Sequence, residues 1–330
     1  MERYLLIVCP DDAADNAVTP GLRLPAPAVP PEERRPMSEP FFFLHLPRTA
    51  GTTVNDILRA NFRPGEMLSL YRDSDFKRHA GGDATALEGI RLIQGHTLLH
   101  RYDPPMMYSR PVRVFTFLRH PVARLVSEYV FLKTWPETAL YRFLNDNAVT
   151  FRDYLTSSRR ELRYRGKNPM TRLLSGCDFD LDGFPRQALD TAKRHLEKVF
   201  CCFGLQERFD ESLLMIGDFL GLQNVYYEKR NVLAKGVKED VGEADVHLAL
   251  ERNAADMELY AFASDLFAAR AAAKGPGFAA RVRRFRAVNA RYAKVCALIA
   301  QKTGTDGPGD IENPKDAFLF PDQSPPGSSR

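Results

Sequence analysis

Short apolar runs alternate along the central part of the chain with segments whose apolar positions repeat at the spacing of a helix. The apolar runs, which are typical of buried strands, occupy residues 41–46, 89–96, 110–120 and 198–205. Strands that alternate with helices favour an α/β fold in which helices flank a parallel sheet. The sequence predicts this fold, with additional helices near the C-terminus.

Helical spacing is clearest directly after the strand-like runs. After the first run, Val54, Ile57 and Leu58 fall on one face of a helix, and a second helix is predicted to begin at Pro121, a favoured first-turn residue. Further helices are predicted in parts of 150–175 and 185–197, and over 207–221, 244–272 and 277–301.

The two ends of the chain lack this periodicity. Residues 11–40 contain seven prolines among scattered charges, and the last residues are rich in glycine, proline, serine and aspartate. We therefore predict a disordered leader at 1–38, one domain at 39–302 and a disordered tail at 303–330. Met37 lies just before the first strand, so a translation start there fits the pattern, and we expect the leader to be dispensable.

Charge and composition narrow the class of protein. A net charge of +4 is far below that of a typical nucleic-acid-binding domain, but it suits an anionic cofactor or substrate. The five cysteines form no C-x-x-C pair, which is typical of reduced thiols. Apolar runs are too short to span a membrane, and LLIVC is too short for a signal-peptide core. We predict a cytoplasmic protein without nucleic-acid partners, whose oligomeric state the sequence leaves open.

The loop after the first strand has the composition of an anion-binding site. Its sequence, PRTAGTT, combines one arginine, one glycine and three threonines directly before a helix. Backbone N–H groups and hydroxyls at a helix N-terminus converge on a phosphate, and a nearby cation completes such a site. The Walker A pattern is absent. By itself the loop could also be a structural turn in which Thr52 or Thr53 caps the helix.

A second phosphate site is predicted at the end of the strand in 110–120. Arg119 lies just past the carboxyl end of this strand, and Ser127 follows on the next helix. Ligands of open α/β sheets bind beyond the carboxyl ends of the strands, and a guanidinium matches two phosphate oxygens. An arginine here is more often a surface ion-pair residue. Together with the first loop, however, it predicts a ligand that carries phosphates at two ends.

The two motifs together resemble those of carbohydrate sulfotransferases that use 3′-phosphoadenosine 5′-phosphosulfate (PAPS). HLPRTAGTT resembles the loop that holds the 5′-phosphosulfate, and FLRHPVARLVSEYVFLK resembles the motif that holds the 3′-phosphate. QGH, FGLQERFDESLLMIGDFLG and NAADMELYAFASDLF resemble three further segments of the family, in family order. The likeness is greatest to the heparan/uronyl 2-O-sulfotransferase-like type, and it implies a P-loop-NTPase-like sheet.

This resemblance implies roles for individual residues. His96 falls at the position of the histidine base, whereas His45 lies in the first strand and is expected to be packed. Arg48 stands where the family usually has lysine, and it would neutralise charge on the departing 5′-phosphate. His100 is the alternative base and, with Arg172, a candidate for acceptor binding. For NPMTRLLSG, however, a capping motif with a solvated Arg172 is the preferred interpretation. The residues implied to bind PAPS are Arg48, Thr49, Ala50, Gly51, Thr52, Thr53, Arg119 and Ser127.

The resulting hypothesis is an enzyme that transfers the sulfuryl group of PAPS to an acceptor hydroxyl by in-line displacement, with a histidine base and no metal. The acceptor is predicted to be a glycan, a glycolipid or a small hydroxylated metabolite. Two alternatives stay open. The replacement of lysine by Arg48 allows a non-catalytic relative that only binds PAPS or a glycan, and the chain could also be a nucleotide kinase with a degenerate phosphate loop.

Overall fold

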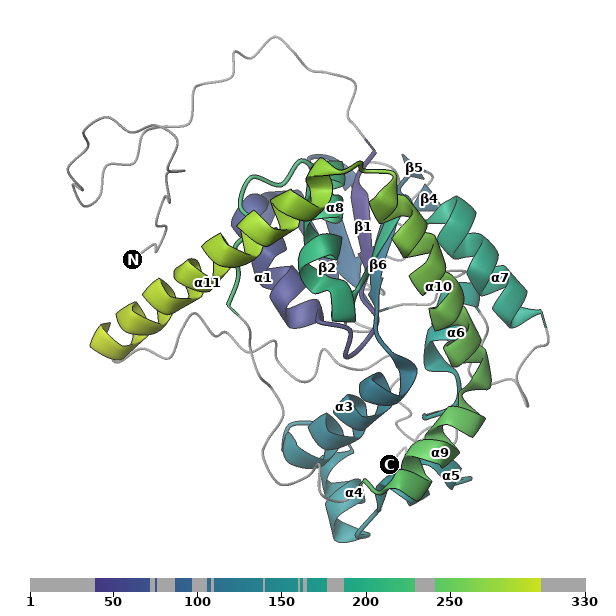
Figure 1. Cartoon of the computed structure of the whole chain (residues 1–330). Helices are drawn as coiled ribbons and strands as arrows, with labels where there is room; N and C mark the ends of the chain where they lie inside the picture. Colours follow the sequence, from purple (N-terminus) through teal and green to yellow (C-terminus); the bar gives the residue numbers. More distant parts are fainter. Residues whose placement is uncertain are drawn as a thin grey trace, which may run out of the picture. The chain divides into compact units, whose positions relative to one another are not determined.

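The sheet and the helices around it confirm the predicted α/β fold with additional C-terminal helices (Figure 1). The computed structural model describes residues 39–71, 75, 87–96, 106–107, 110–138, 140–159, 161–162, 165–176, 187–228 and 241–303. All of these residues belong to the compact unit Glu39–Arg330, which is separate from Met1–Ser38. The predicted leader and the predicted tail beyond Thr303 lie outside the described residues.

A five-stranded parallel sheet with the order β2-β3-β1-β6-β7 forms the centre of this unit. Its strands are β1 (Phe41–Leu44), β2 (Met67–Leu70), β3 (Leu92–Gly95), β6 (Arg113–Leu118) and β7 (Cys202–Leu205). The chain builds β2 and β3 on one side of β1 and then crosses to build β6 and β7 on the other. The carboxyl end of β1 is therefore a topological switch point, where ligands of such sheets bind.

The helices follow the predicted pattern with shifted boundaries, except that the short helix at Tyr141–Asp146 was not predicted. They are α1 (Gly51–Asn61), α3 (Pro121–Thr134), α4 (Tyr141–Asp146), α5 (Phe151–Thr156), α6 (Pro169–Ser175), α7 (Ala188–Arg194), α8 (Phe209–Leu220), α9 (Glu243–Arg252), α10 (Ala254–Ala272) and α11 (Gly277–Thr303). Two short strands, β4 (Met106–Met107) and β5 (Arg110–Pro111), form an antiparallel pair. Across the described residues, no helix combines the length and the apolar character needed to cross a bilayer.

Two predicted strands are shorter than expected: β1 ends at Leu44, so that His45 follows it, and β3 begins only at Leu92. Three further differences have a structural cause. The strand predicted over 110–120 begins at Arg113, because Arg110 and Pro111 pair with β4 instead. The strand predicted over 198–205 is shortened to β7, because a π-helical turn occupies His195–Val199. The helix predicted over 244–272 is two helices, α9 and α10, which meet at Asn253.

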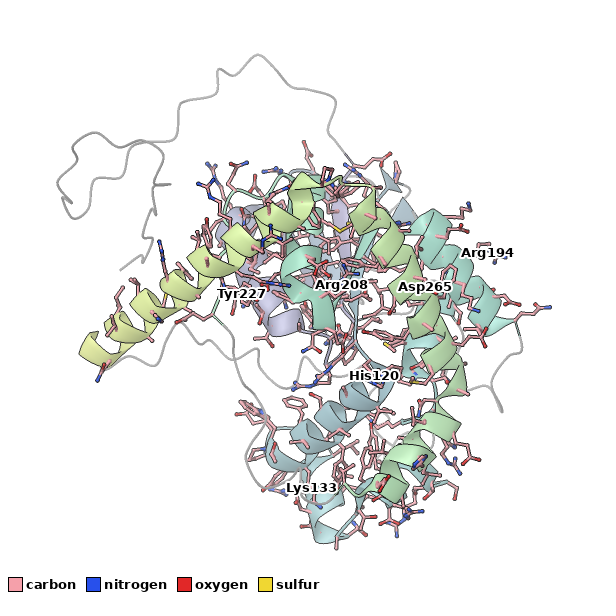
Figure 2. The ribbon with its side chains drawn as sticks, viewed as in Figure 1. His120, Lys133, Arg194, Arg208, Tyr227 and Asp265 are labelled. Carbon is pink, nitrogen blue, oxygen red and sulfur yellow. The ribbon has the colours of Figure 1, made fainter. Side chains whose placement is uncertain are left out.

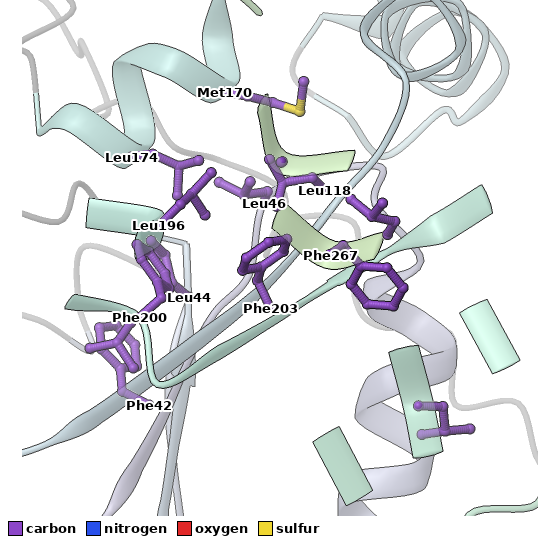
Figure 3. Packing of buried hydrophobic residues seen from close by; sticks show 14 of the residues in the cluster. Phe42, Leu44, Leu46, Leu118, Met170, Leu174, Leu196, Phe200, Phe203 and Phe267 are labelled. Atoms are coloured by element: carbon purple, nitrogen blue, oxygen red, sulfur yellow. The ribbon is translucent and has the colours of Figure 1, made fainter. Parts of the chain in front are cut away.

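Alternate residues of β1 pack against two different layers of helices, as expected for a strand buried on both faces. On one face, Phe42 and Leu44 join a cluster that includes Met170 of α6 and Phe267 of α10 (Figure 3). On the other face, Phe43 joins a cluster formed with α1 and α8. Because β1 is held from both sides, the loop that follows it starts from a fixed position.

Candidate active site

The predicted site residues follow three adjacent strands. His96 comes directly after β3, Arg48 lies four residues after β1, and Arg119 comes directly after β6. Leu44, the last residue of β1, pairs with Gly95 of β3 and Thr116 of β6. The carboxyl ends of the three strands therefore meet at one edge of the sheet, and the structure brings the two predicted phosphate motifs together there.

The loop between β1 and α1 has a tightly constrained backbone. Arg48 and Ala50 adopt left-handed conformations, with φ of 67° and 76°, which are uncommon outside glycine. The Thr49 hydroxyl is fully buried and donates a hydrogen bond to the carbonyl oxygen of Leu46 at 2.7 Å. Thr49 therefore shapes the loop from within, although it was predicted to bind the ligand directly.

The start of α1 has features of an anion cradle. Ala50 is its N-cap residue and offers no side-chain acceptor to the first-turn N–H groups. Thr52 and Thr53 lie in this turn and are half-buried. A Cβ atom at Gly51 would lie only 1.6 Å from Nε2 of His45, so glycine alone allows this imidazole to pack against the helix start. The alternative that Thr52 or Thr53 caps α1 is wrong, because α1 begins at Gly51.

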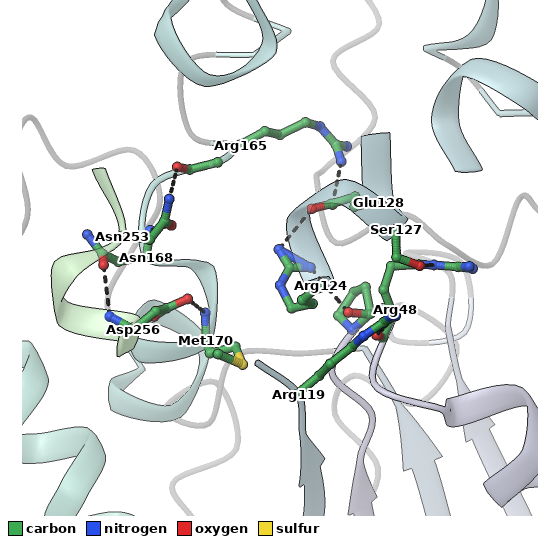
Figure 4. A network of polar contacts seen from close by, with 12 residues as sticks. Arg48, Arg119, Arg124, Ser127, Glu128, Arg165, Asn168, Met170, Asn253 and Asp256 are labelled. Atoms are coloured by element: carbon green, nitrogen blue, oxygen red, sulfur yellow. Dashed lines mark hydrogen bonds and ion pairs between the residues drawn. The ribbon is translucent and has the colours of Figure 1, made fainter. Parts of the chain in front are cut away.

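Arg48 joins the first motif to the second. Its Nε donates a hydrogen bond to Oγ of Ser127 at 3.1 Å, and its guanidinium lies over the ring of Phe131, 4.6 Å from the centroid. In return, Nη1 of Arg119 donates to the carbonyl oxygen of Arg48 at 3.1 Å (Figure 4). The loop after β1 is thus connected in two places to the loop after β6 and to α3.

The residue after Arg119 is held by Glu207, which lies just after β7. Glu207 accepts a hydrogen bond from the backbone N–H of His120 at 2.8 Å and another from the hydroxyl of Tyr260 at 2.6 Å. His120 marks the start of α3 in Figure 2. Burial lowers the pKa of Arg119 and outweighs the opposing effect of the Glu207 carboxylate. The Arg119 Nε is buried without a hydrogen-bond partner.

A buried ion network that was not predicted from the sequence contacts the loop after β1 through Pro47. Arg124 donates from Nη1 to the carbonyl oxygen of Pro47 at 3.2 Å and from Nη2 to Glu128 at 2.8 Å. Arg165 contacts the other oxygen of Glu128 at 3.1 Å. Burial favours a raised pKa for Glu128, but the two guanidinium groups outweigh it and hold that pKa below its ordinary value. In the sequence, the i, i+4 spacing of Arg124 and Glu128 could have indicated this ion pair.

The tautomer of His96 is set by the backbone. Its Nδ1 lies 2.7 Å from the carbonyl oxygen of His45, and since a carbonyl oxygen only accepts, Nδ1 carries the hydrogen. Nε2 is then the nitrogen that can take up a proton. The His96 ring is buried against the rings of His45 and Tyr71, with centroids at 4.3 Å and 4.9 Å. This arrangement suits a base whose orientation is fixed before the acceptor binds.

His45 is packed, as predicted, and it remains uncharged. It is 5% exposed, and its Nδ1 lies 3.3 Å from the hydroxyl of Tyr71. Burial, together with the positive charge of Arg48, lowers the pKa of His45 to about 3. The imidazole therefore stays neutral over the whole range in which an exposed histidine would titrate.

We expect the free energy of unfolding to fall as the pH is lowered below 6.5, in part because of His45. The unfolded chain takes up a proton on this residue near pH 6.5, whereas the folded chain does so only at about pH 3. Between pH 7 and pH 5 this difference amounts to about 2 kcal/mol. Urea unfolding at both pH values should show a smaller loss for His45→Asn than for the wild-type chain. An equal pH dependence of the two proteins would contradict this assignment.

The remaining predicted residues are Arg172 and His100. Arg172 is in α6, only 4% exposed, and its Nε donates to the carbonyl oxygen of Lys167, so the solvated interpretation is wrong. The cap of α6 comes from α10 instead, where Asp256 accepts hydrogen bonds from the N–H groups of Met170 and Thr171 (Figure 4). His100 lies outside the described residues. The described ranges contain no cluster of metal ligands, and the prediction that no metal is needed stays a prediction.

Taken together, the fold and these contacts define an α/β protein in which the two predicted phosphate motifs are adjacent at a switch point, an arrangement suited to a nucleotide-dependent transferase. A family model described as galactose-3-O-sulfotransferase matches residues 5–303. Because this match covers most of its length, the chain belongs to the galactose-3-O-sulfotransferase family. No individual curated protein matches the chain.

Family membership confirms the central prediction of the sequence. The protein is a sulfotransferase that uses PAPS as the sulfuryl donor and acts on a carbohydrate. The match supports the resemblance to carbohydrate sulfotransferases in general. It does not support the heparan/uronyl 2-O type in particular, because the matching family is that of the galactose-3-O enzymes. The resemblance was inferred from motifs that correspond to donor-binding segments, and for this reason it indicated the donor better than the acceptor.

Proposed function

We propose that the protein transfers the sulfuryl group of PAPS to the 3-hydroxyl of a galactose residue in a glycan or glycolipid. The observation that carries this proposal is the family match over residues 5–303. The described site supports it, because the loop after β1 and the loop after β6 contact each other through Arg48, Arg119 and Ser127. A donor with phosphates at both ends would contact both loops.

The residues present fit PAPS. The Arg119 Nε is buried without a hydrogen-bond partner, next to a motif that resembles a 3′-phosphate site. Gly51, Thr52 and Thr53 begin a helix of 11 residues without a side-chain cap, and such a terminus favours a negative charge. Bound there, PAPS would supply an activated sulfuryl group, and the first-turn N–H groups of α1 would face its 5′ end.

The proposed base is His96. Its Nδ1–H is held by the carbonyl oxygen of His45, so Nε2 would take the proton of the acceptor hydroxyl. The role of His96 as the base was inferred from the resemblance to the heparan/uronyl 2-O type, and we keep it in this proposal. Positioned donors and a fixed base reduce the reorganisation that the reaction requires, which is how such sites lower a barrier.

The proposed acceptor can be tested with matched sugars. The full chain is incubated with PAPS and a galactose-terminated oligosaccharide, and mass spectrometry detects the gain of one sulfuryl group. The 3-deoxygalactose analogue serves as the control and should gain none. Sulfation of the 3-deoxy analogue, or of a uronic-acid acceptor in preference to galactose, would contradict the proposed position.

Arg119→Ala should weaken the binding of adenosine 3′,5′-bisphosphate by about 10- to 100-fold, because a charge-assisted hydrogen bond contributes about 1.5–3 kcal/mol. Isothermal titration calorimetry measures this directly. Arg142→Ala, at an exposed position of α4, serves as the control and should bind like the wild-type protein. Unchanged affinity of the Arg119 variant would remove this residue from the phosphate site.

A further inference from the structure

Two adjacent cysteines, Cys201 and Cys202, lie where β7 begins, at one edge of the sheet. Successive side chains of a strand point to opposite faces. Cys201, however, lies in a bend just before β7, and both cysteines pack against the apolar cluster that contains Phe43. Their Sγ atoms are therefore only 4.0 Å apart, and both side chains are half-buried rather than enclosed in the core.

The two thiols differ in how readily they lose a proton. The S–H of Cys202 can donate to Sγ of Cys201, and together with the positive charge of Arg113 this outweighs burial and lowers the pKa of Cys201. Burial raises the pKa of the Cys202 thiol. A thiolate attacks the sulfur of a disulfide, and a second thiol beside it can then displace the mixed disulfide. Cys201 is thus placed to attack and Cys202 to resolve.

We propose that Cys201 and Cys202 form a redox-active dithiol, which a small disulfide such as oxidised glutathione converts to a vicinal disulfide. The thiolate of Cys201 attacks one sulfur of the small disulfide, and the first glutathione thiol leaves. Sγ of Cys202 then loses its proton to solvent, attacks Sγ of Cys201 and displaces the second glutathione. The dithiol is oxidised by the loss of two hydrogens, and the small disulfide is reduced to two thiols. This inference is independent of the proposed donor and acceptor.

The bond formed in this way is expected to be readily reversible. Adjacent Cα atoms are about 3.8 Å apart, whereas ordinary disulfides join Cα atoms about 4.4–6.8 Å apart, so a vicinal disulfide is strained and easily reduced. Closure also removes the S–H of Cys201, which in the reduced protein donates to the carbonyl oxygen of Val114 at 3.0 Å. The same carbonyl oxygen accepts the backbone N–H of Cys201 at 2.9 Å, next to the pairing of Cys202 with Phe115. Oxidation is therefore expected to loosen the start of β7 from β6.

Peptide mapping tests the proposal directly. The full chain is equilibrated with mixtures of oxidised and reduced glutathione, its remaining thiols are alkylated, and trypsin releases residues 199–208, which contain these two cysteines and no others. As the mixture becomes more oxidising, this peptide should lose two hydrogens and escape alkylation, and dithiothreitol should reverse the change. Cys202→Ser should stop at a glutathione adduct on Cys201, whereas Cys201→Ser should leave Cys202 largely unmodified. Cys296→Ser, in α11, is the control and should behave like the wild-type protein.

Residue-resolved hydrogen exchange measures the structural effect. In the oxidised protein the backbone N–H of Cys201 should exchange at least about tenfold faster, because it loses the carbonyl oxygen of Val114. The backbone N–H of His45, which donates to the carbonyl oxygen of Gly95 at 2.9 Å, is the control and should keep its rate. Alkylation of both cysteines at every glutathione ratio, or a disulfide from either one to another segment of the chain, would overturn the proposal. Unchanged exchange at Cys201 after oxidation would overturn the predicted loosening of β7.

Discussion

Replacement of His96 by asparagine is expected to lower kcat by about 10²- to 10⁴-fold, the usual contribution of a positioned general base. Asparagine can still donate a hydrogen bond to the carbonyl oxygen of His45, which the Nδ1–H of histidine does now at 2.7 Å. It has no nitrogen that can take up a proton. The variant therefore separates the role of His96 in catalysis from its role in holding the local structure.

Sulfuryl transfer to a galactoside, followed by mass spectrometry, measures the effect on kcat. Calorimetry with adenosine 3′,5′-bisphosphate should show that binding to the His96→Asn variant is unchanged. His247→Asn, at an exposed position of α9, is the matched control and should retain full activity. Wild-type turnover of the His96 variant would refute the base assignment, and loss of nucleotide binding would indicate a structural role instead.

The elements with a clear apolar pattern were predictable from the sequence. FFFL and RVFTFL are buried on both faces of the sheet and form the continuous apolar runs that such strands require. The helix start at Pro121 was also predictable, because proline fixes the backbone for a first helical turn. In these segments local preference and tertiary packing agree.

Other elements depend on partners that are distant in the sequence. β2 was not predicted, because MLSL is short, lies at the edge of the sheet and is only partly buried. The break between α9 and α10 arises because the side chain of Asn253 bonds the carbonyl oxygen of Gly166 and the N–H of Asn168. No pattern within the helical segment itself indicates these bonds, which join residues more than 80 positions apart.

In the candidate site, too, some features could be predicted from local sequence and others depend on distant residues. Its residue types were visible in the two loops, and the two motifs together predicted a ligand that carries phosphates at two ends. The contact of Arg48 with Ser127 spans 79 positions, and neither loop by itself indicates it. The packing of His45 against Gly51 could not be predicted from the sequence either. It depends on a distance so short that a single added Cβ atom at Gly51 would clash with the imidazole.

Glu128→Gln is expected to lower the free energy of unfolding by about 3–5 kcal/mol, the usual effect of removing one partner from a buried ion pair. The side chains of Arg124 and Arg165 are only 3% and 7% exposed, and both donate to Glu128. A neutral amide would leave two positive charges buried without a compensating carboxylate. Urea unfolding of the variant and the wild-type protein at pH 7 measures the difference.

A matched control shows whether the loss of stability comes from the burial of the ion pair or from the removal of any carboxylate. Glu197 forms an ion pair with Lys198 in which both side chains are largely exposed, so Glu197→Gln should change the unfolding free energy by less than about 1 kcal/mol. Adding Arg165→Gln to Glu128→Gln removes one of the uncompensated charges, so the double variant should be more stable than the sum of the single effects predicts. Purely additive effects, or a loss at Glu128 no larger than at Glu197, would contradict the proposed network. Because Arg124 also holds the carbonyl oxygen of Pro47, a confirmed effect would tie the stability of α3 to the geometry of the phosphate loop.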